Sequence, residues 1–311
     1  MTNLEARLTD GRTVIMDGGV GTEMERKGLA MNGDVWSGAA HIDHADVVRE
    51  VHEDYIRAGT EIITANTFAT ARHVLDTIGE GDNAAQITRD GIALAKQARD
   101  NVATGDVWIA GSMSSMASLT QISATATGQA AADSYREHAD AMAEAGCDFF
   151  LAEMMIDKAN TALVLDAAKA TGLPVWIGLS AAVDANGQVT GYQGGTYFAD
   201  KLAGDFTAVV DNALTRDGQV VGIMHSEIEA TAPALDVLRQ RWSGPTMAYA
   251  ESGRLVLPDW DFSQVVSPDD YAEIAADWVD NHGVTIVGGC CGTGADHIRA
   301  LSDRLAGCAG V

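Results

Sequence analysis

The stretch VTIVGGC, Val284 to Cys290, completes a set of eight short apolar or β-branched runs along the chain. A longer segment with helical periodicity lies between successive runs, the pattern of strands alternating with helices. The runs are Thr13–Asp17, Glu61–Thr67, Val107–Gly111, Cys147–Glu153, Pro174–Ser180, Val220–His225, Pro245–Glu251 and Val284–Cys290. Such alternation builds a parallel sheet, and eight is the strand number of a closed (β/α)8 barrel. The sequence therefore predicts an α/β fold of the TIM-barrel type, with residues 1–311 as one domain.

Three of the intervening segments have apolar residues on one helical face and end in a glycine. They are Ala45–Gly59, Ala130–Gly146 and Ser267–Gly283, and we expect a capping residue near the start of each. An open, doubly wound parallel sheet is the alternative fold. It is disfavoured because the stretch after the first run, DGGVGTEMERKG, lacks the GxGxxG spacing of a dinucleotide-binding turn.

Composition excludes several kinds of partner. The chain has 44 acidic and 20 basic residues, a net charge of −24, whereas nucleic acids and anionic membranes require a cationic surface. No apolar stretch approaches 18 residues, so we expect no membrane-spanning helix. The N-terminus does not resemble a signal peptide and four cysteines do not make a disulfide framework, so we expect a cytoplasmic protein. This composition is compatible with a homo-oligomer.

The carboxyl ends of barrel strands form the active site in such folds. The residues expected there are Asp17-Gly18-Gly19, Asn66-Thr67, Gly111-Ser112, Glu153, Ser180, His225, Tyr249 with Glu251, and Cys290-Cys291. Two cysteines, a histidine and several carboxylates should therefore converge on one face. Glu153 follows the apolar letters FFLA, so its carboxylate must be paired or functional.

Adjacent cysteines are the least ordinary feature of the chain. Cys290 and Cys291 are poorly placed to bridge each other, because consecutive Cα atoms lie about 3.8 Å apart and a disulfide requires roughly 4.4 Å or more. With His225 they would make a set of two thiolates and one imidazole, which suits Zn²⁺ with one open position. His225 taken alone is more often a hydrogen-bonded core histidine. Cys147 is interpreted as a core residue and Cys308 as incidental.

Six motifs, in this order, resemble the homocysteine S-methyltransferase family. They are MDGGVGTEMERKG (Met16–Gly28), VWSGAAHIDHADVVREVHEDYIRAG (Val35–Gly59), ITANTFAT (Ile63–Thr70), FLAE (Phe150–Glu153), YAESG (Tyr249–Gly253) and GGCCGTGADHIRAL (Gly288–Leu301). The resemblance runs nearly end to end. It implies a (β/α)8 barrel and a zinc ion held by three cysteines, with the sulfur of homocysteine completing the zinc shell. The implied activity moves a methyl group from an activated small-molecule donor to homocysteine or a related thiol, giving methionine or a thioether, as in methionine biosynthesis.

The resemblance also implies roles for individual residues. Cys290 and Cys291 correspond to two of the zinc ligands. The expected contacts to homocysteine or the donor are Asp17, Gly18, Glu153, Trp36 and Thr67.

The chain departs from the family pattern at three places. Met224 and His225 stand where the family has an asparagine and its third cysteine. The letters GSMSSMASLTQ (Gly111–Gln121) replace a Gly-Pro-rich motif, and EMMID (Glu153–Asp157) lacks the usual proline. We therefore interpret His225 as the third zinc ligand. Two thiolates and a neutral imidazole leave a less negative centre than three thiolates, which favours a strongly activated donor, such as a sulfonium or quaternary ammonium, or a thiol other than homocysteine.

Two other functions are compatible with these residues. A zinc hydrolase or lyase would use water as the fourth ligand and Glu153 as a general base. A thiol- and metal-binding protein without catalysis is the other alternative. The chain encodes no cobalamin or folate module, so a free small-molecule donor is the simpler expectation.

Overall fold

The computed structural model describes residues 4–115, 126–156, 158–191, 204–256 and 259–306. Eight parallel strands form one sheet in the order β1-β12-β9-β8-β5-β4-β3-β2. Their bounds are β1 Val14–Ile15, β2 Ile62–Thr64, β3 Trp108–Ser114, β4 Phe149–Met155, β5 Val175–Leu179, β8 Val220–Glu227, β9 Thr246–Glu251 and β12 Ile286–Gly289. A parallel bridge between Met16 and Ile62 joins the two ends of this order. The sheet is therefore a closed barrel, which confirms the predicted fold, and the doubly wound alternative is wrong.

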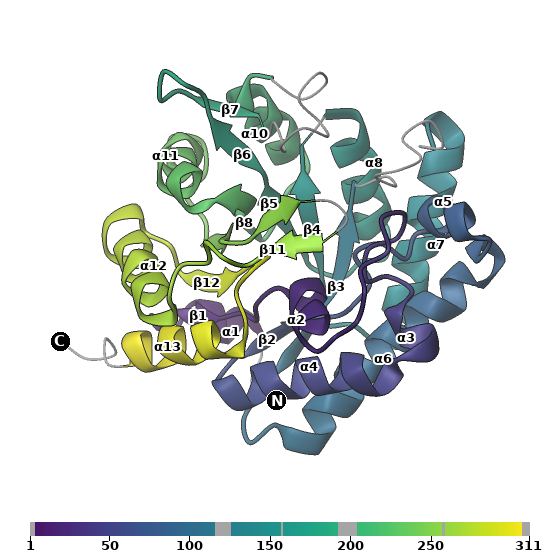
Figure 1. Ribbon diagram of the computed structural model, residues 1–311. Coiled ribbons are helices and arrows are strands. Elements are labelled where there is room, and N and C mark those ends of the chain that lie inside the picture. Colours follow the sequence, from purple (N-terminus) through teal and green to yellow (C-terminus); the bar gives the residue numbers. More distant parts are fainter. Residues whose placement is uncertain (1–3, 116–125, 157, 192–203, 257–258, 307–311) are drawn as a thin grey trace.

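Helices surround the barrel, and at least one follows each strand (Figure 1). They are α1 Leu4–Leu8, α2 Val20–Arg26, α3 Ala40–Asp43, α4 Ala45–Ala58, α5 Arg72–Leu75, η1 Asp76–Ile78, η2 Gly81–Asn83, α6 Ala84–Val102, α7 Gly128–Ala145, α8 Lys158–Lys169, α10 Phe206–Leu214, α11 Ile228–Arg239, α12 Pro268–His282 and α13 Ala295–Ala306. Two antiparallel hairpins extend from the strand ends: β6 Ala181–Val183 with β7 Val189–Gly191, and β10 Arg254–Val256 with β11 Asp259–Asp261. Within the described residues, no helix has the length and apolar character needed to cross a bilayer.

Each expected run contains a barrel strand, but three strands end later than expected. Strand β3 continues to Ser114, β4 to Met155 and β8 to Glu227. Gly111 does not end β3; it is a close-packing position, where an added Cβ would lie 3.0 Å from Met142 Sδ and 3.1 Å from Cys147 Sγ. Cys147 itself is buried, as expected of a core residue.

The expected helix ends are confirmed at three glycines. Gly59, Gly146 and Gly283 follow α4, α7 and α12 with φ of 108°, 84° and 66°, the left-handed conformation that glycine adopts without a Cβ penalty.

The expected helix starts are confirmed only in part. Ser267 Oγ accepts a hydrogen bond from the Asp270 amide and so caps α12. The expectation is wrong for α4 and α7, where His44 and Thr127 occupy the N-cap positions without a side-chain bond. At α4 the reason is that α3 ends at Asp43, so that His44 is both the last capping position of α3 and the first of α4. No extended segment with a capping side chain separates the two helices.

Side chains pointing into the barrel form one apolar cluster. It includes Met16, Trp108, Phe149, Trp176 and Met247, and the rings of Phe149 and Trp176 lie 4.2 Å apart between centroids. Leu4 and Leu8 of α1 pack against this cluster. Arg7 between them binds the Glu61 carboxylate with two bonds of 2.6 Å and the Thr13 carbonyl at 2.8 Å. Because Glu61 and Thr13 precede β2 and β1, helix α1 covers the amino-terminal end of the barrel.

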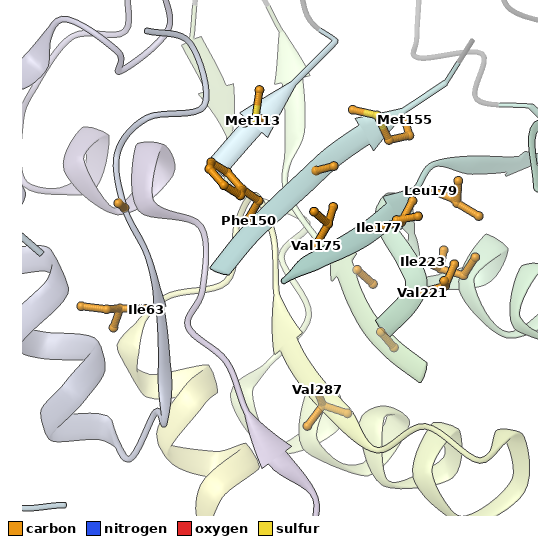
Figure 2. Close-up of a cluster of buried hydrophobic side chains, with 14 of the residues drawn as sticks. Ile63, Met113, Phe150, Met155, Val175, Ile177, Leu179, Val221, Ile223 and Val287 are labelled. Atoms are coloured by element: carbon orange, nitrogen blue, oxygen red, sulfur yellow. The ribbon is translucent and has the colours of Figure 1, made fainter. Parts of the chain in front are cut away.

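The alternate residues of the same strands point outward and form a second, larger cluster beneath the helices. Figure 2 draws part of this cluster and labels, among others, Phe150 on β4, Ile177 on β5 and Val221 on β8. This two-residue alternation decides which side chains can reach the interior and the site above it.

Candidate metal and substrate site

The carboxyl ends of β8 and β12 place three predicted metal ligands together. Ligand atoms of His225, Cys290 and Cys291 all lie within 4.8 Å of one another. The two sulfurs are 3.7 Å apart, and Cys290 Sγ lies 3.1 Å from His225 Nδ1. These are side chains from two strands that are 65 residues apart in sequence, and the closed barrel brings them together. A histidine/cysteine group of this kind could hold a metal ion.

The turn that carries the cysteines is fixed by backbone contacts. The Cys290 amide donates a hydrogen bond to the Ala250 carbonyl on β9 at 2.8 Å. The amide and the hydroxyl of Thr293 both donate hydrogen bonds to the Cys290 carbonyl. Gly292 has φ of 87° and an added Cβ there would meet the Gly253 amide nitrogen at 2.3 Å. A glycine is therefore required at this turn.

Burial controls the protonation of the central thiol. Cys290 is 2% exposed, and burial, together with the adjacent Cys291 thiol, raises the pKa of Cys290 well above its ordinary value. Because the thiolate is the form that binds metals, Cys290 needs a nearby cation to ionise at neutral pH.

Glu153, on β4, links His225 of the metal-ligand group to Ser112 on β3. Its Oε2 lies 2.8 Å from His225 Nε2, and its Oε1 accepts a hydrogen bond of 2.5 Å from Ser112 Oγ on β3. The carboxylate is buried and paired, as the apolar run before it required. The ring of Phe68 lies against His225, with centroids 5.4 Å apart, so one face of the imidazole is apolar.

Asp17 lies at the end of β1 and is fully buried. Its two oxygens accept hydrogen bonds from the Thr64 amide at 2.6 Å and the Thr64 hydroxyl at 2.8 Å. Tyr249 from β9 donates to the Gly18 carbonyl at 2.8 Å, and so joins the ends of β9 and β1. Burial outweighs the Thr64 bonds and raises the pKa of Asp17 to about 7. A buried carboxyl in this state is suited to receive a cationic group, which would restore its charge.

Gly18 and Thr67 have structural contacts that account for much of their placement. An added Cβ at Gly18 would lie 2.8 Å from both the Thr293 carbonyl oxygen and the Tyr55 hydroxyl. Thr67 is fully buried, and its hydroxyl bridges the Ser112 carbonyl and amide at 2.9 Å and 3.0 Å. It braces the end of β2 against β3. Their expected substrate contacts stay predictions.

Two tryptophans lie together beside the N-terminal loop. Trp36 is half-buried with φ of 52°, and its ring centroid lies 6.3 Å from that of Trp260 on β11. Neither indole nitrogen has a hydrogen-bond partner among the described residues. Trp260 was not expected from the sequence, because it lies in a hairpin that no barrel pattern predicts.

Two further described residues expected at the site, Glu251 and Ser180, make no contact with the three proposed metal ligands through a hydrogen bond. Glu251 ends β9, and burial raises its pKa to about 7. Ser180 is fully buried, and its hydroxyl has no hydrogen-bond partner in the described parts of the chain. Thr64 and Phe68 were not expected as site residues, although each lies within the motif ITANTFAT that carried the resemblance. Residues 116–121 of the altered motif after β3 lie outside the described residues.

Comparison with known proteins gives a consistent result over the whole barrel. The family model for homocysteine S-methyltransferase matches residues 14–305. Mouse betaine–homocysteine S-methyltransferase 1 is 25% identical over 96% of this chain and 74% of its own length. Selenocysteine methyltransferase of Astragalus bisulcatus is 23% identical over 94% of this chain and 92% of its own. The metallated form of the homocysteine methyltransferase MmuM from Escherichia coli superposes with a TM-score of 0.77 at 22% identity, covering 97% of this chain and 99% of that one, and so shares the fold.

Proposed function

The chain belongs to the homocysteine S-methyltransferase family, and from this premise we propose that it methylates a thiol at a zinc ion held by His225, Cys290 and Cys291. The acceptor is homocysteine or a related thiol, and the donor is a free sulfonium or quaternary ammonium compound. The observation that carries the proposal is the convergence of the three ligand atoms within 4.8 Å at the carboxyl end of the barrel.

The spacing of the donor atoms supports a zinc site. Two sulfurs bound at about 2.3 Å to a tetrahedral zinc ion are about 3.8 Å apart, and those of Cys290 and Cys291 are 3.7 Å apart. The 3.1 Å contact between Cys290 Sγ and His225 Nδ1 is a hydrogen bond that metal binding would replace. Two soft sulfur ligands and an imidazole favour zinc over magnesium or calcium, which prefer oxygen.

The ligand set bears on the choice of donor. Zinc would supply the charge that keeps the buried thiols, and the thiol of the acceptor, in the ionised form. Two cysteines contribute one negative charge fewer than the three that the resemblance implies, so an acceptor thiolate is bound more tightly and is less nucleophilic. A donor with a good leaving group, such as a sulfonium, compensates for this.

The acceptor site is proposed around Asp17. Its buried carboxyl, with a pKa of about 7, would ionise beside an amino-acid ammonium group and accept charge-assisted hydrogen bonds from it. We propose Gly18, Thr67 and Glu153 as further contacts of the acceptor or of the loop that holds it. The mouth of a barrel lined in this way takes small molecules.

The donor site is proposed at Trp36 and Trp260. Indole faces bind sulfonium and quaternary ammonium groups through cation–π attraction, worth about 0.5–2 kcal/mol for each ring.

Reduced, metal-binding thiols also fit a cytoplasmic location, where they are protected from disulfide formation.

Metal analysis and X-ray absorption test this function together. We expect one zinc ion per chain in the wild type, loss of zinc affinity in His225→Ala, and one added sulfur neighbour when homocysteine is present. Full zinc stoichiometry and affinity in His225→Ala would remove His225 from the site. Zinc with no added sulfur would contradict a thiol acceptor and favour the hydrolase alternative.

A further inference from the structure

Two β-bulges lie at the strand ends that carry Glu153 and His225. The register of β4 against β5 shifts between Ala152 and Met155, and that of β8 against β9 shifts between Met224 and Glu227. Each bulge contains a non-glycine residue with positive φ, Met154 at 55° and His225 at 46°. Across the described residues, Trp36 is the only other non-glycine residue in this region of φ. Bulges and strained residues of this kind re-aim side chains near functional sites.

The bulge in β8 changes where His225 points. Val220 and Met224 belong to the cluster inside the barrel, whereas Val221 and Ile223 belong to the outer cluster. By the same alternation, His225 would follow Ile223 outward. Its ring instead contacts Glu153 and Cys290 at the barrel mouth. The strained conformation of His225 therefore serves to bring its imidazole to the cysteines.

Glu153 reaches the imidazole from the opposite side to the sulfur. The contact with Glu153 Oε2 assigns the Nε2 proton to this bond, so that Nδ1, which faces Cys290 Sγ, is the ring nitrogen available to a metal ion. Ser112 fixes the other carboxylate oxygen through its 2.5 Å hydrogen bond. Glu153 is 4% exposed, so water does not compete for these bonds.

We propose that Glu153 is a positioning residue that holds His225 in the tautomer and orientation required for metal binding through Nδ1. This inference rests on the metal site of the proposed function. Partners of this kind on a metal-binding histidine fix its ring and raise its basicity, and their loss typically lowers metal affinity about 10- to 100-fold. Each carboxylate oxygen keeps a second acceptor position, so the role leaves room for a contact between Glu153 and the acceptor.

A double-mutant cycle on zinc affinity separates this role from a general structural one. Zinc affinity is measured by competition with a chromogenic chelator for the wild type, Glu153→Gln, His225→Cys and the double variant. Glutamine keeps the size of the side chain but weakens the bond to Nε2, since a neutral amide oxygen replaces a carboxylate oxygen. A cysteine at 225 has no ring for Glu153 to orient. We expect Glu153→Gln to weaken zinc binding at least about 10-fold beside His225 and less than about 2-fold beside Cys.

Controls make each outcome decisive. Glu273→Gln changes a carboxylate outside the site, on α12, where it is paired with Arg304, and we expect it to leave zinc affinity within about 2-fold. The d–d spectrum of the Co²⁺ form should shift in Glu153→Gln and not in Glu273→Gln. If Glu153→Gln does not fold, as judged by circular dichroism, Glu153→Asp replaces it and retracts the carboxylate by one methylene.

Two results would overturn the inference. One is unchanged zinc affinity in the Glu153 variant, and the other is the same loss in both backgrounds. If the wild type binds no zinc or cobalt, the proposed function itself fails, which is a distinguishable result.

Discussion

Asp17 takes two hydrogen bonds from a single residue, Thr64, whose amide and hydroxyl bind the two carboxylate oxygens at 2.6 Å and 2.8 Å. The pair joins the carboxyl ends of β1 and β2, where the sheet closes. Even with both bonds, the carboxyl is buried deeply enough for its pKa to rise to about 7. Asp17 is therefore a group whose charge changes near neutral pH, and this has consequences for both stability and substrate choice.

The stability of the metal-free protein should fall as the pH rises from about 4 to about 7 because of Asp17. Its folded pKa is raised from 3.8 to about 7, so the unfolded chain loses this proton first. The stability due to protonated Asp17 is fully present below about pH 4 and is lost as the pH approaches 7. Relative to Asp17→Asn, the wild type should lose roughly 2–3 kcal/mol between pH 5 and pH 8. Urea denaturation at a series of pH values measures this, and parallel profiles for the two proteins would contradict it.

Asp17 should also discriminate between thiols that carry an ammonium group and those that do not. Asp17→Asn should lower kcat/KM for homocysteine about 10- to 100-fold, the range expected for losing a charge-assisted hydrogen bond. The same variant should leave kcat/KM nearly unchanged for the des-amino analogue, 4-mercaptobutyrate. Equal losses for both thiols would place the ammonium group elsewhere.

The two tryptophans should act on the donor and not on the acceptor. Trp260→Leu and Trp36→Leu should each raise KM for a cationic donor about 3- to 30-fold while KM for the thiol changes little. Steady-state kinetics with each substrate varied in turn measures the split. Trp242→Leu is a matched control, since that half-buried tryptophan bonds the Pro245 carbonyl ahead of β9, away from the barrel mouth. A rise in both constants would indicate a general change in the mouth.

His225→Cys should change the dependence of the rate on the donor. A third thiolate makes the centre more negative and the bound acceptor more nucleophilic, so a poorly activated donor gains more than a sulfonium does. We expect the ratio of rates with sulfonium and quaternary ammonium donors to fall in the variant that retains zinc. A ratio equal to that of the wild type would sink the link between ligand set and donor.

Arg7 should matter for stability far from the site. It is 5% exposed and binds Glu61 with two bonds of 2.6 Å, so Arg7→Ala leaves a carboxylate at the covered end of the barrel without its partner. We expect a loss of about 2–4 kcal/mol in the free energy of unfolding. Arg12→Ala, which removes an exposed arginine paired with Asp10, should leave the urea midpoint unchanged. Similar midpoints for the two variants would contradict this account.

The sequence predicted those features of the fold that depend on local pattern. Eight apolar runs gave eight strands, and the alternation Phe149, Leu151, Glu153 places the carboxylate on the inner side with its apolar neighbours. The position of the cysteine pair in the site was predicted from its place at the end of the last strand alone. The expected side-chain cap of α4 is absent, because a short helix, α3, leads directly into it through His44.

The parts that could not be predicted depend on three-dimensional contacts. His225 was expected at the site from its place in the family pattern, but alternation along β8 would turn it outward, and the bulge that corrects this has no local sequence signature. Trp260 lies in a hairpin after β9 and meets Trp36 across more than 220 residues of chain, so no spacing rule connects them. The bond between Ser112 and Glu153 likewise exists only because β3 and β4 are paired.

Helix α1 closes one end of the barrel, so that the barrel is open only at the end that carries the cysteines. Leu4 and Leu8 cover the inner cluster at the amino-terminal end, while the cysteines lie at the other. Both substrates must then enter, and both products leave, by the same opening. The molecule that binds deepest must therefore bind first and leave last. We expect ordered binding and release, in which the molecule nearest Cys290 dissociates only after the one bound closer to the opening.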